Sequence, residues 1–164
     1  MSKEFDKIYN TYQPKLKTLF NKQLKDKDQT EDLVQETLLK VWKNLDTYND
    51  KYTMSTWVYT IAFNTLKNYY SSIKTHITYS ADVKDSENPL SFDSPENLMI
   101  AAEQEDSFLK AVGKLGDNFL EVYVLREVEG LSYKGISSQL NVSEGTVKSR
   151  LKRSRDYIKK EMSV

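Results

Sequence analysis

The apolar residues of this 164-residue chain recur with the spacing of α-helices. Near the N-terminus they run from Phe5 to Phe20, and Pro14 within this run predicts a kink or a restart of the helix. A second apolar stripe runs from Leu33 through Trp42 to Leu45, and further stripes follow it. No segment alternates apolar and polar residues over the length of a strand. We therefore expect an all-α fold, with helices over residues 5–20, 33–45, 57–70, 98–112, 119–128, 132–140 and 143–162.

A break in this pattern divides the chain into two halves. Between about residues 75 and 93 the helical period is lost, and Ser, Asp, Asn and Pro accumulate. Ser94 followed by Pro95 is a typical start for the next helix. We predict two small helical domains joined by a flexible acidic linker: residues 1–74, the linker over 75–94, and residues 95–164.

The composition excludes several classes of function. The chain has no cysteine, so disulfides, thiol nucleophiles and cysteine zinc sites are absent. His76 is the single histidine, which rules out a histidine-based catalytic triad or a two-histidine metal site. No run approaches the ~18 apolar residues of a membrane span, and the N-terminus shows no secretory signal. We expect a cytoplasmic protein that uses no cofactor, no metal and no membrane.

A formal net charge of zero conceals a strong segregation of charge. Residues 1–74 carry a net charge of +3, residues 75–114 carry −5, and residues 115–164 carry +2. All four arginines lie in the last of these blocks, and residues 145–160 alone carry +6. A basic helix beside an acidic segment is typical of a protein that binds nucleic acid.

A helix-turn-helix pattern coincides with this basic segment. A short amphipathic helix meets a turn at Asn141, and Ser143 is placed to cap the next helix. At 100° per residue, the face of that helix expected to pack inward carries Val147, Leu151, Ser154 and Ile158. Lysine and arginine suit phosphate contact, and Arg150 could also reach a guanine edge; the alternative is a solvated basic helix. The residues predicted to contact duplex DNA are Ser143, Glu144, Thr146, Lys148, Ser149, Arg150, Lys152 and Arg153.

The two halves resemble two regions of one protein family. The run over residues 126–162 resembles region four of bacterial sigma factors, in the extracytoplasmic-function branch of the sigma-70 family. The runs over residues 30–49 and 55–70 resemble region two of the same family. The resemblance implies a non-enzymatic transcription initiation factor that directs core RNA polymerase to promoters. Region two would bind the clamp helices of the largest subunit and hold the minus-ten element, while region four would bind the minus-thirty-five element and the polymerase flap.

The helix at residues 30–45 carries a polar face that the resemblance assigns to the polymerase clamp. Its carboxylates repel one another at a spacing of four residues, and a basic partner would relieve that repulsion. Leu39 is an apolar side chain on this charged face. The alternative is an ordinary solvated face. The predicted polymerase-binding residues are Asp32, Gln35, Glu36, Leu39 and Lys43.

The polar segment 46–57 and the helix after it correspond to the part of the family that captures single-stranded promoter bases. Such capture needs aromatic stacking surfaces and cations that follow the phosphates. Trp57 also falls on an apolar helical stripe, so a purely structural role is the alternative for it. The predicted residues are Tyr48, Asn49, Lys51, Tyr52, Trp57, Asn64 and Lys67.

One departure from the family concerns the helix after this segment, where relatives usually carry several arginines. Here those places are taken by Thr60, Phe63, Ser71 and Ser72. Because phosphate neutralisation drives most of the affinity for DNA, we expect weak duplex binding by this half. We hypothesise that promoter engagement depends on the C-terminal half or on an auxiliary DNA-targeting factor, either a protein or an RNA-guided complex. An anti-sigma factor is a further partner that the resemblance implies.

Two other functions stay open from the residues alone. A stand-alone helix-turn-helix transcriptional regulator would need a dimerisation element, for which residues 98–112 are the candidate. A metal-dependent nuclease would use Asp28, Asp32 and Glu36, although these carboxylates should face outward on one helix. The acidic linker either follows the family's path toward the polymerase active centre or is a plain tether.

Overall fold

The protein is described here by a computed structural model that covers residues 3–24, 26–80 and 95–163. Every regular element within these ranges is helical, which confirms the predicted fold class. None of the helices in the same ranges combines the length and apolarity needed to cross a lipid bilayer. The elements are α1 (Lys3–Gln23), α2 (Lys27–Asn44), a 3₁₀ turn (Leu45–Thr47), α3 (Met54–Ser80), α4 (Pro95–Gly113), α5 (Asp117–Tyr123), a π-helical turn (Val124–Val128), α6 (Tyr133–Leu140) and α7 (Glu144–Met162).

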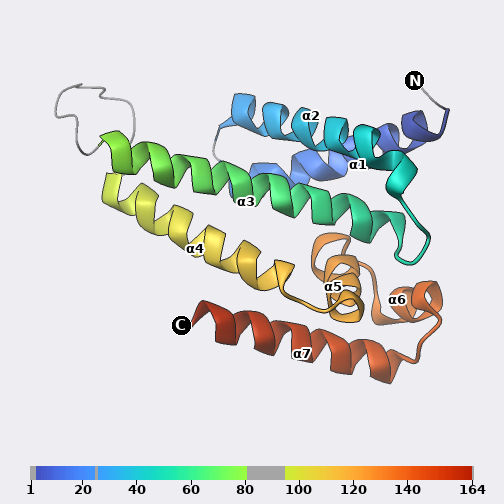
Figure 1. The fold of residues 1–164 in the computed structure, drawn as a ribbon. Helices are drawn as coiled ribbons and strands as arrows, with labels where there is room; N and C mark the ends of the chain where they lie inside the picture. The colour runs from blue at the N-terminus through green and yellow to red at the C-terminus, as the bar shows by residue number, and fades with distance from the viewer. Residues whose placement is uncertain (1–2, 25, 81–94, 164) are drawn as a thin grey trace.

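The helices α1, α2 and α3 form the N-terminal bundle, which lies above α4 in Figure 1. Its centre is apolar and fully buried, and includes Leu16, Phe20, Val41 and Val58. α1 does not restart at Pro14. The helix continues on both sides of this proline, which is exposed on the surface of the bundle. A single long helix therefore supports one side of the bundle.

α3 extends past residue 74, where the sequence placed the start of the linker. The Ser- and Thr-rich end of α3 is helical as far as Ser80, and the hydroxyl of Thr75 donates to the carbonyl oxygen of Ser71 at 3.0 Å. α4 lies alongside α3 (Figure 1), and this packing stabilises a segment whose composition alone predicted a coil. The remainder of the predicted acidic linker, residues 81–94, lies outside the described residues.

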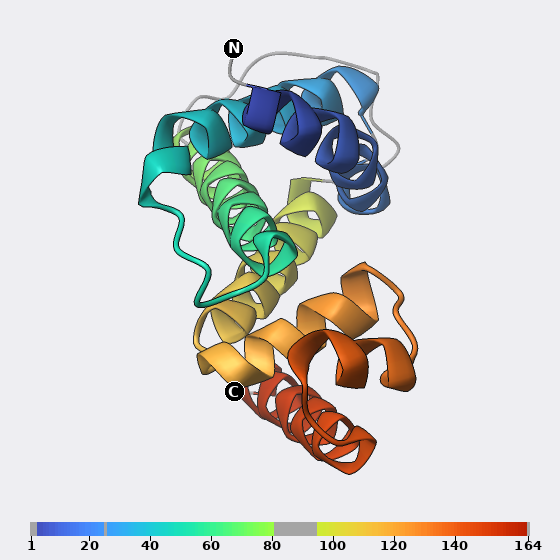
Figure 2. The same cartoon turned by 90° about the vertical axis from the view of Figure 1, so that its right-hand side faces the viewer.

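The C-terminal half gathers α5, α6 and α7 at one end of α4 (Figure 2). A small apolar cluster holds the helix-turn-helix together and consists of Val122, Leu125, Ile136, Val147 and Leu151. The larger cluster of the N-terminal bundle continues through Leu109 and Val112 of α4 to Ile158 of α7. The two halves are therefore in direct contact through α4.

Candidate functional site

The turn between α6 and α7 is built by side chains that satisfy backbone groups. Asn141 adopts a left-handed conformation with φ of 52°, which ends α6. The hydroxyl of Ser137 donates to the carbonyl oxygen of Val142 at 2.6 Å. Ser143 caps α7 by accepting a hydrogen bond from the backbone N–H of Thr146 at 3.1 Å. The predicted turn and cap are both confirmed.

α7 has one face in the core and one in solvent, as its sequence predicts. Val147, Leu151, Ser154 and Ile158 are all buried. Thr146 and Arg150 are half-buried, and the other predicted DNA-facing side chains on α7 are exposed: Glu144, Lys148, Ser149, Lys152 and Arg153. Among the described residues, no carboxylate pairs with Arg150, Lys152 or Arg153. This leaves cations free to meet phosphate oxygens along the outer face of α7.

Other cations of the C-terminal half already have partners within the protein. Arg155 forms an ion pair with Glu127 at 2.5 Å, which raises the pKa of the arginine further. The guanidinium of Arg126 lies 4.8 Å from the ring centre of Tyr133, and Lys148 lies 5.6 Å from the same ring. These contacts fix α6 and the π-helical turn relative to α7.

The polar face of α2 (Asp32, Gln35, Glu36, Leu39 and Lys43) is exposed at all five positions. Glu36 forms an ion pair with Lys40 one turn along the helix at 2.6 Å, which partly relieves the repulsion among the carboxylates. Leu39 is 48% exposed. The carboxylates point away from the bundle, and no three His, Asp or Glu side chains of the described chain come together as a metal site.

An apolar groove next to this face was missed by the sequence analysis. Trp42 was predicted within the buried stripe of α2, but its side chain is 49% exposed. On the circumference of α2 it lies between buried Leu38 and exposed Leu39, which explains the error. Tyr9 of α1 is also 43% exposed, and the groove between the two helices has a volume of about 640 Å³. The groove is lined by Phe5, Tyr9, Gln35, Glu36, Leu38, Leu39 and Trp42.

Aromatic contacts stabilise the 46–57 segment. The rings of Tyr48 and Trp57 lie 5.3 Å apart at an angle of 53°, and both side chains are half-buried. The hydroxyl of Tyr48 donates to the carbonyl oxygen of Tyr52 at 2.8 Å. Asn49 and Lys51 are exposed at the tip of the segment. Trp57 therefore packs within the segment while part of its ring stays accessible.

The two remaining candidates for single-stranded DNA lie further along α3. Asn64 is exposed and Lys67 is half-buried. The predicted DNA-contacting residues of the N-terminal half thus extend from the 46–57 segment onto α3.

Acidic residues of the C-terminal half contact this segment. Asp117 at the start of α5 lies 3.6 Å from the ammonium of Lys51 and accepts a hydrogen bond from the hydroxyl of Tyr52. Glu121 accepts a hydrogen bond from the backbone N–H of Thr53 at 2.9 Å. Contact with Tyr52 and attraction to Asp117 raise the pKa of Lys51. No local sequence pattern predicts these contacts, because they join residues 65 to 68 positions apart.

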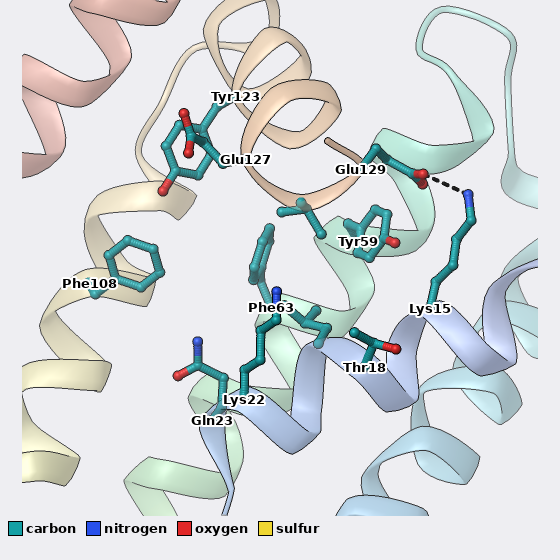
Figure 3. A pocket seen from close by; sticks show the side chains of 12 residues that line it. Lys15, Thr18, Lys22, Gln23, Tyr59, Phe63, Phe108, Tyr123, Glu127 and Glu129 are labelled. Atoms are coloured by element: carbon teal, nitrogen blue, oxygen red, sulfur yellow. Dashed lines mark hydrogen bonds and ion pairs between the residues drawn. The ribbon is translucent and has the colours of Figure 1, made fainter. Parts of the chain in front are cut away.

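A cavity of about 400 Å³ lies where the two halves meet (Figure 3). Glu129 closes one side of it through an ion pair with Lys15 at 2.6 Å. Burial and the nearby Glu129 carboxylate raise the pKa of Tyr59, and burial raises that of Tyr123 to about 12. Both phenols are therefore neutral at physiological pH. The residues labelled in Figure 3 are Lys15, Thr18, Lys22, Gln23, Tyr59, Phe63, Phe108, Tyr123, Glu127 and Glu129.

Two known families match the chain, one in each half. The family described as Sigma-70 region 2 matches residues 8–75, which include most of α1, all of α2 and most of α3. The family described as Sigma-70, region 4 matches residues 106–158, which include the helix-turn-helix.

The chain also aligns with curated relatives over most of its length. The chain is 30% identical over 168 residues to the ECF RNA polymerase sigma-E factor of Haemophilus influenzae, covering 98% of this chain and 88% of that protein. It is 31% identical over 163 residues to the ECF RNA polymerase sigma-E factor of Escherichia coli K12, covering 95% and 85% respectively. A solved structure of the sigma factor RpoE from Bartonella quintana, in complex with the anti-sigma factor NepR, aligns over 99% of both chains with a TM-score of 0.50. At 24% identity, that structure shows a shared fold.

Proposed function

Because the chain belongs to the extracytoplasmic-function branch of the sigma-70 family of RNA polymerase sigma factors, we propose that it works entirely by binding, with no catalytic step of its own. Its partners are core RNA polymerase and promoter DNA, and its work is done in the cytoplasm, where the polymerase acts. The observation that carries this proposal is the outer face of α7, where Arg150, Lys152 and Arg153 have no acidic partners in the described chain while the inner face of the helix is buried.

The outer face of α7 is proposed to read duplex DNA in the minus-thirty-five element. Gly145 and Ser149 are small and exposed, so the backbone at the start of the helix can approach base edges. Lys152 and Arg153 follow one turn later and suit the phosphates on either side of the groove. Arg150 is the residue proposed to reach a guanine edge.

The polar face of α2 and the adjoining groove are proposed to bind the clamp helices of the polymerase. The groove offers Leu39, Trp42 and Tyr9 as apolar contacts, while Asp32 and Glu36 supply negative charge at its rim. A helix that carries both apolar and basic side chains would complement this surface. The flap of the polymerase is assigned to the C-terminal half.

The scarcity of cations on α3 supports weak duplex binding by the N-terminal half. Phe63 is buried, and the hydroxyl of Thr60 donates to the carbonyl oxygen of Thr56 at 2.7 Å, so neither side chain is available to a phosphate. Ser71 and Ser72 are exposed but uncharged. We therefore retain the hypothesis that an auxiliary protein or RNA-guided complex brings the polymerase to its promoter. An anti-sigma factor, such as the one bound to the Bartonella relative, is the proposed negative regulator.

Promoter opening is expected to be weak without such an auxiliary factor. With only core polymerase and this chain on the cognate promoter, few open complexes should form at physiological salt, because α3 neutralises few phosphates. Permanganate footprinting of unpaired thymines measures the fraction of open promoter. Lowering the salt should increase that fraction, and efficient opening at physiological salt would refute the auxiliary-factor hypothesis.

Comigration with core polymerase tests the proposed function itself. The chain should elute with core enzyme at one-to-one stoichiometry in size-exclusion chromatography, and sequencing of the promoters bound by that complex would identify its targets. A chain that elutes without core polymerase, and that binds palindromic DNA as a dimer, would instead be a stand-alone regulator. The match of residues 8–75 to region 2 does not favour that alternative.

A further inference from the structure

The C-terminal half places three carboxylates against the 46–57 segment and the start of α3. Asp117 and Glu121 come from α5, and Glu129 follows the π-helical turn. Asp117 engages Lys51 and Tyr52, and Glu121 engages the backbone N–H of Thr53. These contacts join residues 65 to 68 positions apart in the chain.

The third carboxylate contacts the next turn of the same surface. One oxygen of Glu129 accepts a hydrogen bond from the hydroxyl of Ser55 at 3.1 Å, and the other pairs with Lys15 at 2.6 Å. The hydroxyls of Tyr12 and Ser55 lie 2.9 Å apart, which extends the network into α1. The side chain of Glu129 is only 9% exposed while that of Lys15 is 40% exposed, so the carboxylate is shielded and the lysine stays partly in solvent.

The groups that hold these carboxylates are the groups that a nucleic-acid backbone would use. A phosphate binds to ammonium groups, hydroxyls and backbone N–H groups, and all three kinds face Asp117 and Glu121 here. Carboxylate oxygens carry the same sign of charge as phosphate oxygens. The carboxylates and a single strand therefore cannot occupy Lys51, Tyr52 and Thr53 together.

We propose that α5 blocks the single-strand site of the unbound chain, with Asp117 and Glu121 standing in for the phosphates of promoter DNA. This inference rests on the proposed function of the 46–57 segment. In the unbound protein, α5 of the C-terminal half covers the groups of the 46–57 segment that would bind the strand. Binding of a single strand requires α5 to move away, so strand capture and rearrangement of the two halves are coupled.

The strength of the contact suits a reversible block. Lys51 and Asp117 are 68% and 61% exposed, so solvent screens their attraction and salt weakens it. Glu121 is only 9% exposed and orders the segment through a backbone hydrogen bond. The cavity of about 400 Å³ beside Glu129 leaves part of the junction unpacked, which lowers the cost of separating the halves there.

The test removes the two charges and measures binding of single-stranded DNA. The double variant D117A/E121Q is compared with wild type in fluorescence anisotropy, using a labelled 12-nucleotide single strand of mixed sequence as the probe. The variant should bind about fivefold more tightly, because the competing carboxylates are gone. Adding K51A to the variant should remove most of that gain, since Lys51 is one of the groups released.

A matched control separates the block from a general effect of charge. The variant D156A/E161Q also loses two negative charges, here from the C-terminal part of α7. Its affinity for the single strand should change by less than about twofold. Equal gains in both variants, or a gain that survives K51A, would overturn the proposal, as would no gain at all. Circular dichroism of each variant shows that it is folded. Comigration of the wild-type chain with core polymerase is measured in a separate experiment. A failure of the proposed function would appear there, and a failure of the proposed block would appear in the affinities for the single strand.

Discussion

Replacing Lys152 and Arg153 together by alanine is expected to weaken binding to minus-thirty-five duplex DNA by about 10- to 100-fold near physiological salt. Both side chains are exposed on the outer face of α7, and neither has an acidic partner in the described chain. Each should neutralise about one phosphate. The slope of log affinity against log salt should therefore fall by about 2, which anisotropy titrations at several salt concentrations would measure.

The lysine pair at the end of the same helix provides the control for this experiment. Lys159 and Lys160 are exposed on α7 but lie beyond the turns that would enter the groove. K159A/K160A removes the same charge and should reduce affinity by less than about threefold. Equal losses in the two double variants would mean that α7 attracts DNA through its net charge and does not dock by its first turns.

A single charge placed in the groove between α1 and α2 is expected to weaken binding to core polymerase by about 30-fold or more. Leu39→Asp introduces a carboxylate between Trp42 and Glu36, where an apolar contact with the clamp helices is proposed. Desolvating that carboxylate without a partner would be unfavourable. Competition against a labelled sigma factor for core enzyme would measure the change in affinity.

Ile100→Asp is the matched control for this substitution. Ile100 is 53% exposed on α4 and lies outside the polar face of α2 and the adjoining groove, the surface proposed to bind the clamp helices. The change introduces the same charge at a similarly exposed apolar position, so neither variant should lose much stability. If Leu39→Asp retained wild-type affinity for core polymerase, the groove would not be part of the interface.

The helix-turn-helix could be predicted from sequence because its signals are local. Ser143 as cap, Asn141 at the turn and the helical period of the buried face of α7 each involve residues only a few positions apart. Each of these features is present in the structure. The order of the helices and the all-α class were predictable for the same reason.

The groove and the contacts between the halves were not predictable in this way. Trp42 lies at the border of an apolar stripe, and whether it is buried depends on how closely α1 packs beside it. The bond between Thr53 and Glu121 joins residues 68 positions apart, and no local pattern marks either partner. The end of α3 was misjudged because packing against α4 overrides the coil preference of its residues. Tertiary contacts decide all three cases.

The position of α4 has a consequence for how the protein melts. α4 packs against α3 on one side and against α7 on another, and one apolar cluster runs through it from the first helix to Ile158. The core of the N-terminal bundle is therefore continuous with α4 and with the C-terminal end of α7. We therefore expect a single calorimetric transition for the whole chain, with the calorimetric and van't Hoff enthalpies in agreement, instead of one melting event for each half.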